Sequence, residues 1–183
     1  MYTLVAFQGP SGSGKTTLQY YLGLEKVVTS TTRSPRPGEV DGVDYHFVSQ
    51  DDMNRMIDGG EMLEFTNYNG NIYGSALASV LHFDGAPRSI VLDSCGIQRV
   101  REELGERCLI VGVYAPEEDC RRRLAQRSTG DCEKRMSSYE AEVEFLLKCD
   151  VVINNSDMNA HRAKGIVDAL RTQLLDTGCV AST

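Results

Sequence analysis

Residues 9–16 read Gly-Pro-Ser-Gly-Ser-Gly-Lys-Thr and constrain the fold of this chain more than any other feature. They match the phosphate-binding pattern G-x-x-x-x-G-K-S/T and follow an apolar run over residues 3–7, which supplies the strand that the pattern requires. Glycines let successive backbone N–H groups point at one phosphate, while Lys15 adds a positive charge and Thr16 a hydroxyl for Mg²⁺. The alternative is a loop rich in glycine and serine that holds no ligand. The context favours a nucleoside triphosphate site, with predicted contacts from Gly9, Ser11, Gly12, Ser13, Gly14, Lys15, Thr16 and Thr17.

The composition is typical of one globular domain. The chain has 183 residues, of which 41% are hydrophobic and 25% charged, so a sizeable core is expected in a single domain over residues 1–183. The net charge of -7 argues against a general nucleic-acid or membrane-surface binder, so local arginines must hold anionic ligands. No apolar stretch approaches the roughly 18 residues of a membrane span, and the cysteines form no C-x-x-C pair. We expect a cytoplasmic protein acting on small molecules, as a monomer or dimer.

Short apolar runs alternate with helical patterns along the chain. Strands are predicted over residues 3–7, 26–30, 89–92, 108–114 and 150–153, and helices over residues 15–22, 96–104, 117–126, 131–147 and 159–175. Buried parallel strands are short and almost continuously apolar, as these runs are. The alternation predicts a three-layer α/β core with a parallel sheet and right-handed crossovers.

Two stretches interrupt this alternation. Residues 31–75 are rich in turn signals, and Asn69-Gly70 between strand-like flanks predicts a hairpin with a type I′ turn. Ser49 resembles the cap of a short helix that runs through residue 57. We therefore expect a small mixed-β insertion on the main sheet. The second stretch, residues 121–135, gathers arginines around a Ser-Thr-Gly turn at 128–130.

Residues 29–47, Thr-Ser-Thr-Thr-Arg-Ser-Pro-Arg-Pro-Gly-Glu-Val-Asp-Gly-Val-Asp-Tyr-His-Phe, resemble the signature of guanylate kinases. The phosphate-binding loop, residues 61–65, residues 70–75, the arginine-rich stretch and residues 151–154 follow that family at matching spacing. The resemblance covers nearly the whole chain. It implies a P-loop core formed by residues 1–30, 76–120 and 136–183, a nucleoside-monophosphate-binding insertion over residues 31–75, and a short helical lid over residues 121–135.

The resemblance implies that the insertion clamps the phosphate of the acceptor nucleotide. Arg33 and Arg36 match the clamping arginines, and Tyr45 and Tyr73 match the phenols beside them. The chemistry agrees, because guanidinium groups bind phosphate bidentately and a phenol donates a hydrogen bond without adding charge. The alternative for the two arginines is a solvated basic turn.

The resemblance also implies how the acceptor base is read. Glu64, Thr29 and Ser75 match residues that face the edge of guanine. A carboxylate can accept from the N1–H and the amino group of guanine, and a hydroxyl can donate to O6. Glu39 is expected to orient Arg36 or the base, and the alternative for Glu39 is a surface acid.

The remaining implied roles concern the metal, the lid and the phosphoryl donor. Asp93 follows a strand where this fold places a carboxylate that holds the waters of Mg²⁺, although it could instead cap the next helix. Arg127 and Arg135 match lid arginines that stabilise charge on the transferring phosphoryl group. Asn154 matches a position near the donor adenine. We interpret Arg121, Arg122 and Arg123 as a solvated helix face.

The chain departs from the family pattern in two places. After the strand acid the family usually carries Leu-Asp-Ile-Asp-x-Gln-Gly, whereas residues 92–96 here read Leu-Asp-Ser-Cys-Gly. The second aspartate, which in the family helps to recognise the guanine amino group, is missing. The stretch between the lid arginines is also shorter than the family pattern.

We interpret the chain as a nucleoside monophosphate kinase that transfers the γ-phosphoryl of ATP, with Mg²⁺, to GMP or dGMP. Lys15, Arg33, Arg127 and Arg135 are the predicted catalytic residues. One alternative is a kinase of another or a modified deoxynucleoside monophosphate, such as a viral enzyme would use. Another is a non-catalytic domain of the same type that binds a phosphopeptide, against which the intact Lys15 and Thr16 argue.

Overall fold

The computed structural model describes residues 2–68, 70–127 and 132–176. Its core is a parallel sheet of four strands in the order β6-β1-β7-β8. The strands are β1 (Leu4–Gln8), β6 (Arg88–Val91), β7 (Cys108–Tyr114) and β8 (Val151–Asn154). Strand β1 lies between two neighbours and is buried along its whole length, which explains its unbroken apolar sequence.

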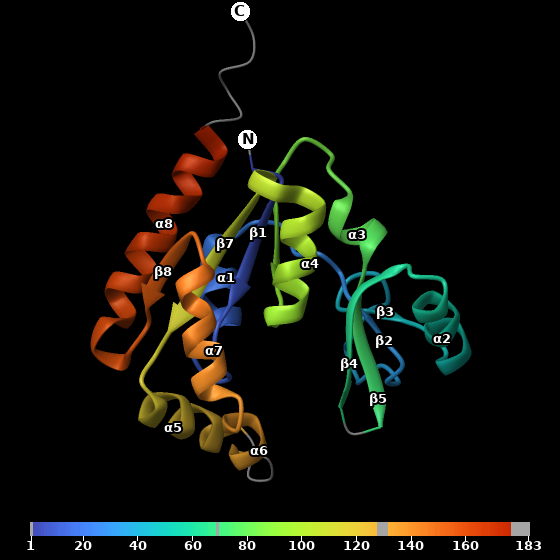
Figure 1. Cartoon of the computed structure of the whole chain (residues 1–183), viewed down its shortest axis with the longest axis horizontal. Coiled ribbons are helices and arrows are strands. Elements are labelled where there is room, and N and C mark those ends of the chain that lie inside the picture. Colours follow the sequence, from blue (N-terminus) through green and yellow to red (C-terminus); the bar gives the residue numbers. More distant parts are fainter. Residues whose placement is uncertain (1, 69, 128–131, 177–183) are drawn as a thin grey trace, which may run out of the picture.

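Helices cover both faces of the parallel sheet (Figure 1). Alternate residues of β1 face opposite sides, so Val5 and Phe7 pack with α1 (Lys15–Leu22) and α8 (Ala160–Asp176). Leu4 and Ala6 pack on the other side with α4 (Ser94–Leu104) and with Phe145 of α7 (Tyr139–Phe145). The predicted three-layer α/β core with a parallel sheet is confirmed.

A second, mixed sheet is formed by β2 (Ser30–Thr31), β3 (His46–Phe47), β4 (Met62–Tyr68) and β5 (Asn71–Ala76). Its order is β3-β2-β5-β4, with β2 and β3 parallel and the other pairs antiparallel. Helix α2 (Gln50–Asp58) packs on it through Met53, and the Ser49 side chain accepts from Asp52 N as the predicted cap. The predicted β4–β5 hairpin is confirmed, while its turn type depends on Asn69, which lies outside the described residues.

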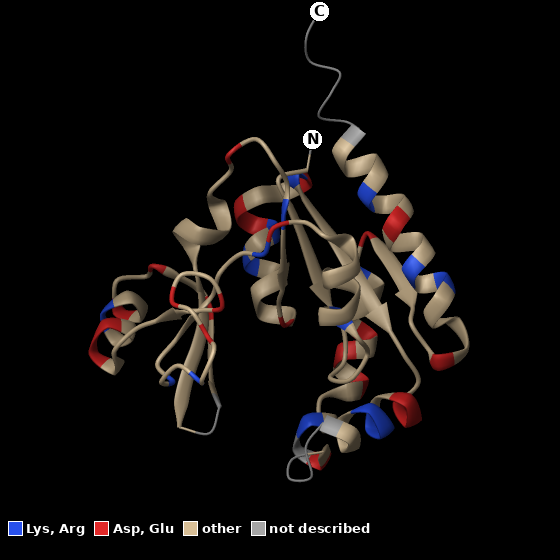
Figure 2. Cartoon of the chain, turned by 180° about the vertical axis from the view of Figure 1, so that it is seen from behind, with Lys and Arg blue, Asp and Glu red and all other residues tan. Residues whose placement is uncertain are grey.

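The arginine-rich stretch forms α5 (Glu117–Arg127) and α6 (Cys132–Met136). A small cluster of Ala115, Cys120, Leu124 and Met136 holds these helices together. Figure 2 shows acidic positions in the first turn of α5 followed by basic positions in the next turn. In Figure 1 the mixed sheet and the α5–α6 pair lie on opposite sides of the carboxyl ends of the core strands. The remaining elements are α3 (Leu77–Leu81) and the 3₁₀ turns Gly105–Arg107, Leu146–Lys148 and Asp157–Asn159.

Two predicted elements were wrong. Residues 26–30 do not form a core strand: Lys26 makes one parallel bridge to Ser89, and the chain then leaves the core so that Ser30 and Thr31 can pair with β5. The helix predicted over residues 131–147 is divided at Ser137 and Ser138, and Asp131 itself lies outside the described residues. Short polar side chains favour helix ends over interiors.

The division of that helix has a packing reason. Met136, at the end of α6, packs in the cluster with α5, whereas Phe145, at the end of α7, packs against the parallel sheet. The prediction also missed the two-residue strand β3 and the short helix α3. None of the described helices has the length and apolar character of a membrane span.

Candidate active site

The loop between β1 and α1 is shaped by glycines with positive φ. Gly12 and Gly14 have φ angles of 83° and 98°, which side chains rarely adopt. A Cβ on Gly12 would lie 2.6 Å from the carbonyl oxygen of Cys120, and one on Gly14 would lie 2.2 Å from Asn155 Nδ2. The loop therefore needs glycine both for its conformation and for the close approach of α5 and the β8–α8 connection.

Lys15 opens α1 and folds back over this loop. Its ammonium group donates to the carbonyl oxygens of Gly9 and Pro10, the latter at 3.0 Å. The pKa of Lys15 is lowered below its ordinary value, mainly because the lysine is buried. The positive charge of Arg135 also lowers this pKa, whereas the negative charge of Glu142 raises it. Thr16 and Thr17 follow in the first turn of α1 and are exposed. The lysine thus sits at the centre of the loop, with charged groups from α6 and α7 close enough to act on it.

Glu142 was missed by the sequence analysis. It lies on α7, and its carboxylate accepts at 2.9 Å from Nε2 of Gln8, the fully buried last residue of β1. Burial raises the pKa of Glu142, Lys15 lowers it and Asp93 raises it. No sequence signal distinguished Glu142 from the other acids of that helix.

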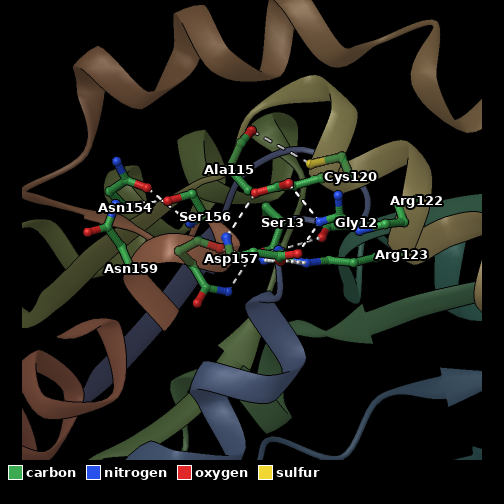
Figure 3. A network of polar contacts seen from close by, with 12 residues as sticks. Gly12, Ser13, Ala115, Cys120, Arg122, Arg123, Asn154, Ser156, Asp157 and Asn159 are labelled. Atoms are coloured by element: carbon green, nitrogen blue, oxygen red, sulfur yellow. Dashed lines mark hydrogen bonds and ion pairs between the residues drawn. The ribbon is translucent and has the colours of Figure 1, made fainter. Parts of the chain in front are cut away.

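Arg123 ties α5 to the phosphate-binding loop (Figure 3). Its Nη1 donates to the carbonyl oxygens of Gly12 at 3.2 Å and Ser13 at 3.3 Å, and its Nη2 donates to the carbonyl oxygen of Asn155 at 2.7 Å. The same guanidinium pairs with Asp157 at 2.7 Å. The expectation that Arg123 belongs to a solvated helix face was therefore wrong. Arg123 lies on the stripe of α5 that includes the buried Cys120 and Leu124, a spacing that could have indicated it.

The other two arginines of that group follow the expectation more closely. Arg121 pairs with Glu117 and Glu133, and Arg122 with Asp119 and Asp157, at the surface of α5. Pairs of this exposure contribute little to stability. The acids that pair with Arg121 and Arg122 thus offset the positive charge of this part of α5.

A cavity of about 440 Å³ adjoins the phosphate-binding loop. Its lining includes Asn155, whose Nδ2 donates to the carbonyl oxygen of Ser13 at 2.7 Å. Asn154, the residue predicted there, instead accepts from Ser156 N at 3.0 Å and does not belong to the described lining. The residues that line this cavity are Gly12, Gly14, Thr17, Tyr21, Arg123, Asn155, Asp157, Ala160, His161 and Lys164.

Arg33, in the loop that follows β2 of the mixed sheet, is held in place by its neighbours. Its Nη2 donates to both carboxylate oxygens of Glu39 at 2.9 Å, and its guanidinium lies 5.6 Å and 5.7 Å from the ring centres of Tyr45 and Phe47. The ring of Tyr73 stands edge-on to Tyr45 with centroids 6.1 Å apart. Arg33 Nε is buried and has no hydrogen-bond partner among the described residues. That orphaned donor is suited to an anionic ligand.

Glu39 is a partner of this arginine and not a free surface acid. Its carboxylate accepts from the backbone N–H of Arg36 at 2.7 Å, which is the main cause of its lowered pKa, with Arg33 adding to the effect. The sequence suggested that Glu39 orients Arg36 or the base. In the structure Glu39 forms its ion pair with Arg33, whereas the side chain of Arg36 is exposed.

Glu64 and Ser75 meet on neighbouring strands of the mixed sheet. They are opposite each other in the β4–β5 pairing, and the Ser75 hydroxyl donates to Glu64 Oε1 at 2.6 Å. Burial raises the pKa of Glu64, Ser75 opposes that shift, and the charge of Asp93 adds to it. Thr29 lies one residue before β2, and because Ser30 pairs with Gly74, it stands beside Ser75 in the register.

Asp93 caps α4, as the alternative interpretation held. Its Oδ1 accepts from Gly96 N at 2.8 Å, and the residue is exposed. The described residues contain no cluster of three or more metal-ligating side chains. Mg²⁺ keeps several of its waters and needs only one or two protein ligands, so a hydroxyl at Thr16 and a carboxylate at Asp93 are a suitable donor set. Arg135 is exposed on α6, whereas the side chain of Arg127 lies outside what the structure describes.

Comparison with known proteins gives consistent matches. The sequence model of one family, described as guanylate kinase, matches residues 1–172. The guanylate kinase of Lactococcus lactis is 33% identical over 178 residues, covering 91% of this chain and 87% of the relative. That of Lactobacillus johnsonii is 36% identical over 180 residues, covering 91% and 88%. The crystal structure of guanylate kinase from Anaplasma phagocytophilum aligns with a TM-score of 0.66 and 28% identity, covering 97% of this chain and 88% of that one.

Proposed function

The chain belongs to the guanylate kinase family, and from that premise we propose that it transfers the γ-phosphoryl group of ATP to GMP or dGMP. The observation that carries the proposal is the pairing of two sites. The first site is the glycine-rich loop with Lys15, at the end of strand β1 of the parallel sheet. The second is at the mixed sheet, where Arg33 is paired with Glu39 and the Glu64 carboxylate accepts from Ser75.

The donor nucleotide is assigned to the loop and the adjoining cavity. Backbone N–H groups of residues 11–16 and the N-terminus of α1 attract its phosphates, with Lys15 as the local charge. The cavity lined by Tyr21, Asn155 and His161 has the apolar and polar surface that a purine ring needs. We assign the adenine to this cavity, with Asn155 in place of Asn154.

The acceptor nucleotide is assigned to the mixed sheet. Arg33, Arg36, Tyr45 and Tyr73 would hold its phosphate, and the ion pair with Glu39 holds Arg33 in position beforehand. Bringing an arginine to the site in advance reduces the entropy lost when phosphate binds. Glu64, Ser75 and Thr29 would face the guanine edge. The same division assigns residues 31–75 to acceptor binding and residues 121–135 to a lid.

Transfer needs no general base, because a phosphate monoester oxygen is already largely ionised at neutral pH. The chain's own contribution is alignment of the two phosphates and neutralisation of charge by Lys15, Arg33, Arg127 and Arg135. When bound, Mg²⁺ would neutralise charge between the β- and γ-phosphates, held by the Thr16 hydroxyl and, through water, by Asp93. The lid and the insertion would close over both nucleotides and exclude water from the γ-phosphate.

A coupled assay of ADP release with GMP, dGMP, dAMP, dCMP and dTMP tests the proposal. We expect GMP and dGMP to be the best acceptors. A preference for dTMP or dCMP would favour the kinase of another deoxynucleotide, and no turnover with any of the five would favour the phosphopeptide-binding domain.

We also propose a cytoplasmic location, where ATP and GMP are available. We propose that the protein is a monomer or a dimer, and light scattering of the purified protein would distinguish the two.

A further inference from the structure

The position of Glu64 depends on an irregularity in the mixed sheet. The β4–β5 register changes from Met62 opposite Ala76 to Glu64 opposite Ser75, so the two strands are out of step by one residue at Leu63. In an uninterrupted pairing Leu63 would face Ser75. Such a bulge changes the direction in which the following side chain points. Here it brings the Glu64 carboxylate to the Ser75 hydroxyl at 2.6 Å.

The other side of Glu64 is closed by the first turn of α4. Gly96 is buried in that turn, and a Cβ on it would lie 3.0 Å from Cγ of Glu64. The same Cβ would lie 3.1 Å from Cδ2 and 3.2 Å from Cβ of Leu92. These separations are shorter than the 3.4–4 Å of ordinary contacts, so a methyl group here would require its neighbours to move.

The backbone of Gly96 cannot withdraw easily from this contact. Its N–H donates to the capping carboxylate of Asp93 at 2.8 Å, which fixes the start of α4. The next residue, Ile97, is 2% exposed and packs in the core with Leu92. Of the groups around Gly96, the Glu64 side chain is the part that can give way, because it is flexible and only half-buried.

We propose that Gly96 is a positioning residue for recognition of the acceptor base. The missing side chain of Gly96 leaves the space in which the Glu64 carboxylate reaches Ser75, and so sets where that carboxylate meets the base. This inference rests on the proposed function, in which Glu64 accepts from the N1–H and the amino group of guanine. According to this inference, helix α4 of the core contributes to base selection in addition to the side chains of the mixed sheet.

The chain contains a matched control. Gly165 is also a helical glycine, in the middle of α8, and a Cβ on it would have no heavy atom within 4 Å. Alanine favours helix more than glycine does, so Gly165→Ala should leave the enzyme active and at least as stable as the wild type. Gly96→Ala makes the same chemical change where the space is occupied.

The experiment measures kcat and KM for GMP and for IMP, which lacks the amino group. We expect Gly96→Ala to lower the GMP/IMP ratio of kcat/KM roughly tenfold, because a displaced carboxylate loses part of a charged hydrogen bond. The loss should lie mainly in the KM for GMP. Gly165→Ala should leave the ratio unchanged. In a Glu64→Gln background, Gly96→Ala should cause no further loss of the ratio, because the effect passes through the carboxylate.

An unchanged ratio in Gly96→Ala, or an equal loss in the Glu64→Gln background, would overturn the inference while GMP remains the substrate. A wild-type chain that does not phosphorylate GMP would overturn the proposed function, and the inference with it. If Gly96→Ala does not fold, Glu64→Asp supplies the test from the other side. That variant withdraws the carboxylate by one methylene, and an unchanged GMP/IMP ratio would contradict the claim that its position matters.

Discussion

The regions proposed for the donor and for the acceptor present different kinds of groups to a ligand. The donor loop presents backbone N–H groups, and its shape is held from outside by Arg123 and Asn155. The region proposed for the acceptor presents side chains, among them Arg33 from the loop after β2 and Glu64 from β4, beside a small core around Met53. Recognition of a phosphate chain depends on loop shape, whereas recognition of a base depends on which side chains are present. Substitutions in the two regions should therefore affect different kinetic constants.

The largest effect should follow removal of the loop's one charged side chain. Lys15→Ala should lower turnover by roughly 10²–10³, because one electrostatic contact with the transferring phosphoryl group is lost. The fold should survive, since the lysine contributes charge and little packing. Steady-state kinetics at saturating ATP and circular dichroism measure both. Retention of more than a tenth of wild-type turnover would show that Lys15 lacks the assigned role.

Arg36→Lys tests the acceptor side. An ammonium group cannot reproduce the bidentate fork, so the KM for GMP should rise and turnover should fall, with kcat/KM lowered roughly tenfold or more. The KM for ATP should be nearly unchanged, which is the contrast with the loop. Arg162→Lys, at an exposed arginine on α8, serves as the control. Equal kinetics for Arg36→Lys and the wild type would make Arg36 a surface charge.

Arg123→Ala should affect the donor side without touching the acceptor side. Removing the hydrogen bonds to Gly12, Ser13 and Asn155 loosens the loop, so the KM for ATP should rise roughly three- to tenfold. Arg121→Ala removes the surface ion pair with Glu117 on the same helix, and it should change the KM for ATP little. If the two substitutions changed the KM for ATP to a similar extent, the claim that Arg123 specifically holds the loop in shape would be refuted.

Cys95→Asp should sharpen base selection by a smaller amount. Cys95 is exposed in the first turn of α4 and lines a groove of about 410 Å³ together with Glu64. An added carboxylate there could accept from the guanine amino group, so we expect the GMP/IMP ratio of kcat/KM to rise roughly threefold. Ser94→Asp, one position earlier on the helix, is the control. An unchanged ratio in Cys95→Asp would mean that Cys95 does not occupy the place of the family's second aspartate.

Glu64→Gln should stabilise the fold while weakening base selection. Burial raises the folded-state pKa of Glu64 above its ordinary value of 4.5, so the ionised carboxylate opposes folding. This opposition is absent below the unfolded-state pKa and grows as the pH rises through the folded-state pKa. We therefore expect Glu64→Gln to raise Tm at pH 7. The Tm difference should vanish near pH 4, and Glu61→Gln, at an exposed position before β4, is the control for removal of a surface charge.

The fold was predictable where the signal is periodic and the element is central. Residues 108–114 and 15–22 have the bounds predicted for them, because β7 is a buried run and α1 begins directly after the loop. The helix over residues 131–147 was not predictable as two pieces, because only the separate packing of Met136 and Phe145 divides it. Residues 26–30 have a strand-like composition, yet they lie where the chain passes from one sheet to the other.

The sequence by itself determined the glycine-rich loop motif, the membership of a family and the residues proposed for the acceptor region, because each is carried by neighbours along the chain. Only the tertiary structure decided which partners hold those residues. Arg123 meets Gly12 across 111 positions and Asn155 meets Ser13 across 142, and no local pattern encodes such contacts. The same is true of Gly96 and Glu64, whose contact exists because the first turn of α4 packs against β4. Local sequence patterns follow from backbone geometry, whereas contacts between residues far apart in the sequence follow from how whole helices and strands pack.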